Sequence, residues 1–139
     1  MKTLSPATNV TVTQTLRDSD IMPTQQRLRI ARFLFAAPQH LSADQIFERV
    51  NLNGDQVSQA TVYNTLRLFV EKGLLNQVII DPNKIFYDTN LSKHHHLYHV
   101  DDGILEDIPN NQIEIKNLPE LPADTLFDGI NIVVRVRRQ

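Results

Sequence analysis

Four of the five histidines in this chain lie in the short run His94–His99, which reads HHHLYH. Alternate side chains of a β-strand point to the same face, so His94 and His96 would share one face and His95 and His99 the other. Imidazole is the commonest metal ligand near neutral pH, and a His-x-His pair directs two nitrogens at one centre. The run therefore predicts a site for a bound ion or cofactor.

Carboxylates close to this run extend the set of donor atoms. A mixed nitrogen and oxygen site without thiolates favours Fe(II), Mn(II) or zinc. Four imidazoles also supply candidate axial ligands for haem, and a solvated histidine run with no bound partner is the third interpretation. The residues alone leave these three open. The carboxylates are Asp88, Asp101, Asp102, Glu106 and Asp107, and the candidates for haem or a second metal are His94, His95, His96 and His99.

Composition excludes several other kinds of chemistry. The chain has no cysteine, which removes disulfides, cysteine-bound zinc, iron–sulfur clusters and thiol catalysis. No apolar run approaches the ~18 residues that cross a bilayer, and the N-terminal residues lack a hydrophobic signal core. We therefore expect a cytosolic protein without a membrane partner.

Length and charge indicate two parts with different partners. The 139 residues suit one domain or two small lobes, with ordinary globular values of 41% hydrophobic and 22% charged residues. Residues 1–80 carry 8 basic and 6 acidic side chains, whereas residues 81–139 carry 6 basic and 10 acidic ones. The first part is thus mildly basic and the histidine-bearing part is acidic.

The first part predicts helices followed by a hairpin. A short helix is expected over 11–20, a second from the Thr24 cap to Pro38, and a third behind the capping box Ser42-Ala-Asp-Gln45. A fourth should run from Ser58 to Lys72, with Gly73 ending it. Strands over 74–80 and 85–88 flank the turn 81–84, and a hairpin after such a helix is the wing of a winged helix.

On the last of these helices, a polar face suits DNA. Asn64 and Arg67 lie opposite the apolar stripe, with Thr61 and Tyr63 on its flanks. These residue types bind base edges or phosphates, and Tyr63 can pack on a thymine methyl. A solvated helix face is the alternative. The DNA contacts we predict are Arg17, Gln26, Arg27, Gln59, Thr61, Tyr63, Asn64, Arg67 and Lys84.

The second part predicts a small sheet with little helix. Short β-rich runs occur at 96–101, 104–108, 112–116 and 129–137, and the last should be a well-buried strand. Such a sheet buries little apolar surface alone, so we expect pairing with a second copy. The predicted fold class is α+β, with a winged-helix domain over 1–80 (its wing reaching about 88) and a dimerisation and sensing domain over 89–139.

Several motifs together resemble the ferric uptake regulator (Fur) family. They are Met22-Pro-Thr-Gln-Gln-Arg27, His40-Leu-Ser-Ala-Asp44, Ala60-Thr-Val-Tyr-Asn-Thr-Leu66, Glu71-Lys-Gly-Leu-Leu75 and Lys93-His-His-His-Leu97. The triple histidine, Phe86-Tyr-Asp-Thr-Asn90, Leu105-Glu-Asp-Ile-Pro109 and the ending Val133-Val-Arg-Val-Arg-Arg138 look most like the iron-response regulator (Irr) branch, associated with haem- and iron-dependent control of transcription.

The resemblance implies a transcription regulator that binds a palindromic, AT-rich operator as a homodimer. It also implies a regulatory site for Fe(II) or Mn(II), or else zinc, between the two domains. Its five ligand positions hold His40, Asp88, His94, His96 and Asp107. Taken alone, His40 would be a capping or surface histidine.

Departures from the family pattern affect several positions. The family's cysteine positions hold His99 and Asp102 here, so a structural zinc on four cysteines cannot form. His95 replaces a frequent Asp, which fits the haem-associated version, and Asn64 replaces the usual Arg. Met22 occupies a position before the first turn that often holds a basic residue in the family. Residues 117–124 take the place of the family's helix in the dimer domain.

Two other functions compete with this one. A winged-helix adaptor that binds proteins without a metal would lack salt-dependent affinity for duplex DNA. A metallohydrolase built on the histidines would need an open metal position and a base, yet the sequence has no HExxH, nucleophile elbow or phosphate-binding glycine loop. We expect no enzyme activity.

Overall fold

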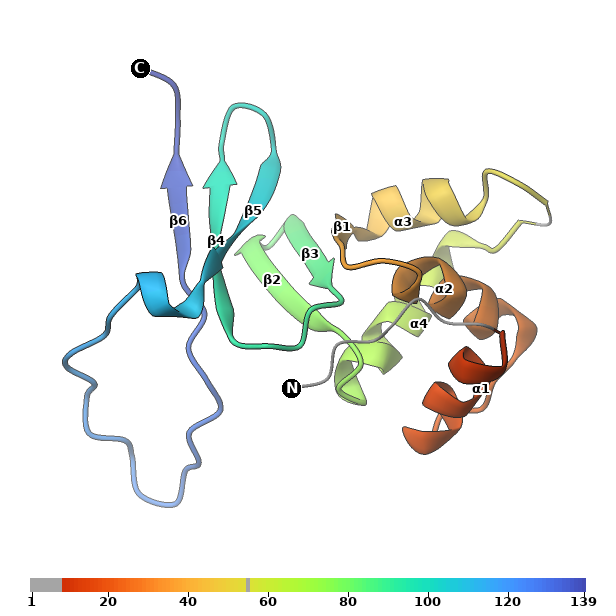
Figure 1. Ribbon diagram of the computed structural model, residues 1–139, viewed down its shortest axis with the longest axis horizontal. Helices are drawn as coiled ribbons and strands as arrows, with labels where there is room; N and C mark the ends of the chain where they lie inside the picture. The colour runs from red at the N-terminus through yellow and green to blue at the C-terminus, as the bar shows by residue number, and fades with distance from the viewer. Residues whose placement is uncertain (1–8, 55) are drawn as a thin grey trace. The chain divides into compact units, whose positions relative to one another are not determined.

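The computed structural model describes residues 9–54 and 56–139. The chain divides into two compact units, Met1–Ser92 and Lys93–Gln139, which we describe separately (Figure 1). Helices and a three-stranded sheet make up the first unit, and a second three-stranded sheet makes up the other. The predicted α+β fold class is confirmed. Among the described helices, none has the length and apolar character needed to span a membrane.

Side-chain caps begin three helices of the first unit where the sequence predicts them, whereas the first helix begins at Asn9 rather than at the predicted residue 11. The Thr24 hydroxyl accepts the Arg27 N–H, and Ser42 and Gln45 form the expected capping box. Ser58 caps the fourth helix in the same way, by accepting from Thr61 N–H. The helices are α1 (Asn9–Asp18), α2 (Gln25–Phe35), α3 (Ala43–Val50) and α4 (Gln59–Glu71).

Two of these helices end in the same hydrogen-bonded turn. At the end of α4, Gly73 has φ +79° and its N–H bonds to Val70, while Leu74 N–H bonds to the Phe69 carbonyl. At the end of α1, Asp20 takes the left-handed conformation with φ 59°, and Ile21 N–H bonds to Leu16. The helix therefore stops at Asp18, two residues before the predicted end.

A three-stranded antiparallel sheet completes the first unit. Its order is β1 (His40–Ser42), β3 (Lys84–Asp88), β2 (Asn76–Asp81). The β2–β3 hairpin is the predicted wing, and the Asp81 carboxylate closes its turn by accepting the Asn83 N–H. The sequence did not predict β1, because three residues are too few to show an alternating pattern.

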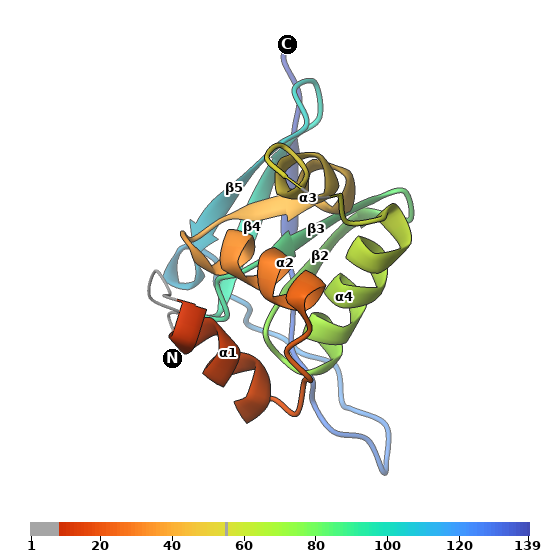
Figure 2. The same cartoon turned by 90° about the vertical axis from the view of Figure 1, so that its right-hand side faces the viewer.

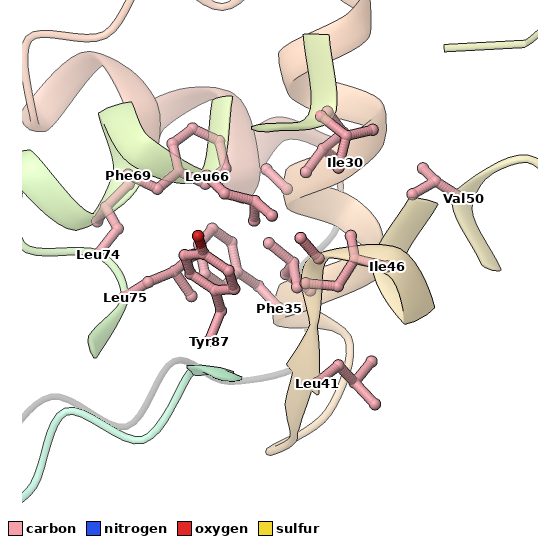
Figure 3. Packing of buried hydrophobic residues seen from close by; sticks show 14 of the residues in the cluster. Ile30, Phe35, Leu41, Ile46, Val50, Leu66, Phe69, Leu74, Leu75 and Tyr87 are labelled. Carbon is pink, nitrogen blue, oxygen red and sulfur yellow. The ribbon is translucent and has the colours of Figure 1, made fainter. Parts of the chain in front are cut away.

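One apolar core joins the helices to this sheet. Ile30, Leu66 and Phe69 are fully buried, and the Phe35 and Phe69 rings stack with centroids 6.1 Å apart. Tyr87 joins this cluster from the sheet (Figure 3). Figure 2 shows α2, α3 and α4 gathered around β2 and β3 of the same unit. The exposed face of α4 is thereby held on a rigid frame.

The second unit is a sheet of order β5 (Ile104–Pro109), β4 (His94–His99), β6 (Val133–Val136). β4 pairs antiparallel with β5 and parallel with β6. A parallel neighbour requires a long return connection, which residues 113–132 provide without helix or strand. The predicted strand over 112–116 is therefore wrong: Asn110–Gln112 is a 3-10 turn that leads into this connection.

The last strand also differs from its prediction. It covers Val133–Val136 rather than 129–137, and it is only partly buried, with Val134 39% exposed. β6 is an edge strand, so one of its sides lacks a neighbour in the sheet, whereas β4 is central. Strand β4 begins at His94, two residues earlier than predicted, and includes the whole histidine run.

Candidate metal centre and DNA-reading helix

Three predicted metal ligands of the second unit lie together on one face of its sheet. His96 is the register partner of Asp107, and its Nε2 lies 3.4 Å from the Asp107 Oδ1 atom. The same oxygen lies 3.4 Å from His94 Nε2. The His94 and His96 rings meet edge to face with centroids 4.6 Å apart. Two imidazole nitrogens and one carboxylate oxygen thus point at a common centre.

The donor set fits a divalent ion. The ligand atoms of His94, His96 and Asp107 all lie within 4.8 Å of one another. The two imidazoles are almost buried, whereas the Asp107 side chain is 48% exposed. Nitrogen and oxygen donors without thiolate suit Fe(II), Mn(II) or zinc, and three donors leave further coordination positions for other ligands.

His95 and His99 lie on the opposite face, as strand alternation predicts. His95 is buried, and its Nδ1 accepts the backbone N–H of Ile132 at 3.3 Å, so the proton of its neutral ring is on Nε2. His99 Nε2 bonds to the Glu106 carboxylate at 2.8 Å. The four candidate haem ligands are therefore divided into two pairs by the sheet.

The first unit brings two more predicted ligands together. His40 on β1 is the register partner of Asp88 on β3, so their side chains share one face of the sheet. Asp88 is buried, and its Oδ1 accepts the Asn90 N–H at 2.9 Å. His40 thus lies beside a carboxylate, as the family resemblance implied and as His40 taken alone did not suggest.

Hydrogen bonds next to this pair hold β1 against β3. The Thr89 hydroxyl accepts the Gln39 N–H at 3.0 Å, and the Thr89 N–H bonds to the Gln39 carbonyl. The Gln39 side chain in turn donates to the carbonyls of Phe33 and Leu34 at the end of α2. The short strand is therefore anchored at the end that carries His40.

The candidate base-reading residues of α4 lie on its solvent side. Tyr63, Asn64 and Arg67 are exposed, and Thr61 is half-buried, with its hydroxyl accepting a hydrogen bond from Ser58. Gln59 is also exposed, in the first turn of the helix. Side chains of these types are therefore available to a groove of DNA.

The candidate phosphate contacts come from three other elements. Arg17 is exposed at the end of α1, and Gln26 and Arg27 are in the first turn of α2. The Arg27 guanidinium donates to the Met22 carbonyl at 3.0 Å. Lys84 is exposed at the first position of β3, at the tip of the wing.

Sequence reasoning missed Asp44 as a residue of this surface. The Tyr63 hydroxyl donates to the Asp44 Oδ1 atom at 2.7 Å. This hydrogen bond is the main cause that raises the pKa of Tyr63 above its usual value of 10.0. Asp44 belongs to the capping-box segment of α3, which gave it a helix-terminus interpretation and concealed its contact with α4.

His99 and Asp102, which occupy the family's cysteine positions, form polar contacts with other side chains. His99 bonds to Glu106, and Asp102 forms an ion pair with the Arg138 guanidinium. The Arg138 backbone N–H also donates to Asp101 at 2.7 Å. Polar contacts thus connect the β4–β5 turn to the residues after β6.

Comparisons with known proteins agree with this arrangement. The model of the ferric uptake regulator family matches residues 19–131. The peroxide-responsive repressor PerR of Staphylococcus aureus (strain Mu50) is 30% identical over 110 residues, which are 78% of this chain and 74% of PerR.

Solved structures share the fold. The ferric uptake regulator of Pseudomonas aeruginosa with manganese has a TM-score of 0.71 at 24% identity, over 92% of this chain and 98% of that one. The ferric uptake regulator of Francisella tularensis with iron has a TM-score of 0.67 at 19% identity, over 86% and 92%.

A winged helix followed by a sheet with a histidine–carboxylate cluster defines the class of metal-responsive DNA-binding regulators. The chain belongs to the ferric uptake regulator family, whose members are transcription regulators rather than enzymes.

Proposed function

We propose that this protein is a transcription regulator whose affinity for operator DNA is set by a divalent ion. The observation that carries the proposal is the convergence of His94, His96 and Asp107 on one centre, within 4.8 Å of one another. In this proposal His40 and Asp88 of the first unit complete the ligand set. An ion held by both units would restrict their relative movement and so select an arrangement that differs in DNA affinity.

The DNA side of the proposal rests on α4 and the wing. Tyr63, Asn64 and Arg67 would read base edges in a groove, with Thr61 and Gln59 at the start of the helix. Arg17, Gln26, Arg27 and Lys84 would bind phosphates and give the affinity its dependence on salt. Such a regulator acts where the genome is, in the cytoplasm.

The opposite face of the second sheet supports a homodimer on a palindromic operator. Register places apolar side chains on this face, away from His94 and His96. Several are exposed or half-buried, so a second copy of the sheet would cover them. They are Leu97, Ile104, Ile108, Val134 and Val136.

The same geometry bears on which ligand the site would take. Fe(II) and Mn(II) fit the five proposed donors, and iron and manganese are present in the two related structures. Zinc is a third candidate. The Irr-like motifs and the three consecutive histidines favour haem, although the sheet separates His95 from His94 and His96. Hemin titration distinguishes these proposals, because a Soret shift lost on triple substitution of His94, His95 and His96 by alanine requires haem binding.

The test combines metal binding with DNA binding. Chelator-treated protein is titrated with Mn(II) to measure metal binding. Fluorescence anisotropy then measures affinity for duplexes selected from a random library, with and without Mn(II) and at several salt concentrations. We expect the ion to change the affinity and Asp107→Ala to abolish that change. Operator affinity that ignores Tyr63→Ala and Asn64→Ala would refute the assigned base contacts. Absence of salt-dependent duplex binding would favour the protein-binding adaptor instead.

A further inference from the structure

The hydroxyl group of Tyr63 is already bonded before any DNA arrives. It donates its proton to the Asp44 carboxylate at 2.7 Å, and both side chains are exposed on the surface of the first unit. The bond to Asp44 is also the main cause that raises the pKa of Tyr63.

Both ends of the Tyr63–Asp44 bond are fixed by the fold. Asp44 is in the first turn of α3, between the two capping-box residues Ser42 and Gln45. Tyr63 is on α4, which packs against α3 across the apolar core. A bond between two capped and packed helices keeps its geometry better than one between two flexible surface side chains, so the phenol has a defined orientation.

This bond determines what the phenol can offer to a base. A tyrosine hydroxyl has one proton to donate, and here a carboxylate takes it. What remains is a lone pair, which accepts from the N6 amino group of adenine or the N4 amino group of cytosine. Guanine O6 and N7, thymine O4 and phosphate oxygens are acceptors, so they cannot bond to the committed hydroxyl, and the Asp44 charge repels phosphate.

We propose that Asp44 is a specificity-determining residue of the DNA surface, because it makes Tyr63 an acceptor for base amino groups and disfavours contacts to acceptor edges and phosphates. The inference rests on the proposed DNA-binding function. Asp44 acts through Tyr63 and is a positioning residue rather than a base contact.

The test compares base preference among variants. Metal-loaded wild type, Asp44→Ala, Asp44→Asn and Tyr63→Phe each select duplexes from a random library, and anisotropy then measures single base-pair changes in the consensus. Glu48→Ala is the matched control, because Glu48 is an exposed carboxylate one turn further along α3. Circular dichroism checks folding, and Asp44→Asn serves if the alanine variant is unstable.

We expect wild type to favour one base pair at the Tyr63 position by roughly 2- to 10-fold, the range of a single net hydrogen bond. Asp44→Ala should lose this preference and bind non-specific duplex more tightly, and it should have no further effect on preference in the Tyr63→Phe background. Glu48→Ala should keep the preference.

Two failures have different meanings. If wild type selects a sequence and Asp44→Ala selects the same one with the same discrimination, the role of Asp44 is refuted while the proposed function stands. If wild type selects no sequence at all, the proposed function fails and this inference fails with it.

Discussion

His96 and Asp107 face each other across β4 and β5, and a single Asp107 oxygen lies 3.4 Å from both His96 Nε2 and His94 Nε2. These distances are longer than those of strong charge-assisted hydrogen bonds, which are about 2.7–2.9 Å. The three groups are therefore close enough together to hold one metal ion, at distances longer than those of strong hydrogen bonds.

Removing the carboxylate of this trio should weaken metal binding while leaving the fold intact. Asp107→Ala deletes a proposed direct ligand, and we expect Mn(II) affinity to fall by at least the roughly 10- to 100-fold that loss of an outer-shell partner costs. Calorimetric titration measures it. Glu106→Ala is the control, because Glu106 is adjacent in sequence but bonds to His99 on the other face. Equal losses in both variants would contradict the assignment.

His95 should behave differently from its two neighbours. Its Nδ1 holds the backbone N–H of Ile132, just before β6. His95→Ala should leave Mn(II) affinity nearly unchanged and should increase hydrogen exchange at the Ile132 amide, because that donor loses its partner. His96→Ala should lower Mn(II) affinity and leave hydrogen exchange at the Ile132 amide nearly unchanged. A large loss of Mn(II) affinity in His95→Ala would place this ring among the ligands instead.

The capping box of α3 should be measurable as stability. Ser42→Ala removes the hydroxyl that accepts the Gln45 N–H, and we expect a loss of about 1 kcal/mol in the free energy of unfolding of the first unit. Urea denaturation followed by circular dichroism measures this change. Ser42→Asp keeps an acceptor at the cap and should retain most of the stability. An alanine variant as stable as wild type would show that the cap contributes nothing.

The pKa of Tyr63 provides a test that needs no DNA. Because the Asp44 bond raises this pKa above 10.0, the phenol stays neutral to higher pH in the folded protein. Its contribution to stability is full below pH 10 and disappears as pH rises through the raised value. Alkaline titration of tyrosinate absorbance should show one phenol that ionises at lower pH in Asp44→Asn than in wild type. An unchanged titration curve would mean that the bond is absent in solution.

The helices of the first unit could be predicted because their signals are local. Thr24, Ser42 and Ser58 cap the helices in which the sequence placed them, and Gly73 ends α4 as expected. The end of α1 was predicted two residues too late, because Asp20 takes the left-handed backbone conformation that glycine usually takes at the end of a helix.

Long-range pairing accounts for what the sequence did not show. Taken without the family resemblance, His40 looked like a capping or surface residue, because its strand exists only through pairing with β3, whose residues come much later in the chain. The alternating Ile113 and Ile115 suggested a strand at 112–116, but the parallel pairing of β6 with β4 requires that segment as a connection. The faces of His94, His95 and His96 followed from strand alternation alone, since that period depends on no distant contact.

The pairing of β1 with β3 also bears on the order in which the chain folds. His94, His96 and Asp107 are brought together by one hairpin, whose ends meet after a short loop closes. The strands of His40 and Asp88 are separated in the sequence by α3, α4 and β2. The two residues therefore meet only after this longer segment has folded. Closing a longer loop costs more entropy and slows folding. We therefore expect the hairpin to bring its three donors together before His40 and Asp88 meet.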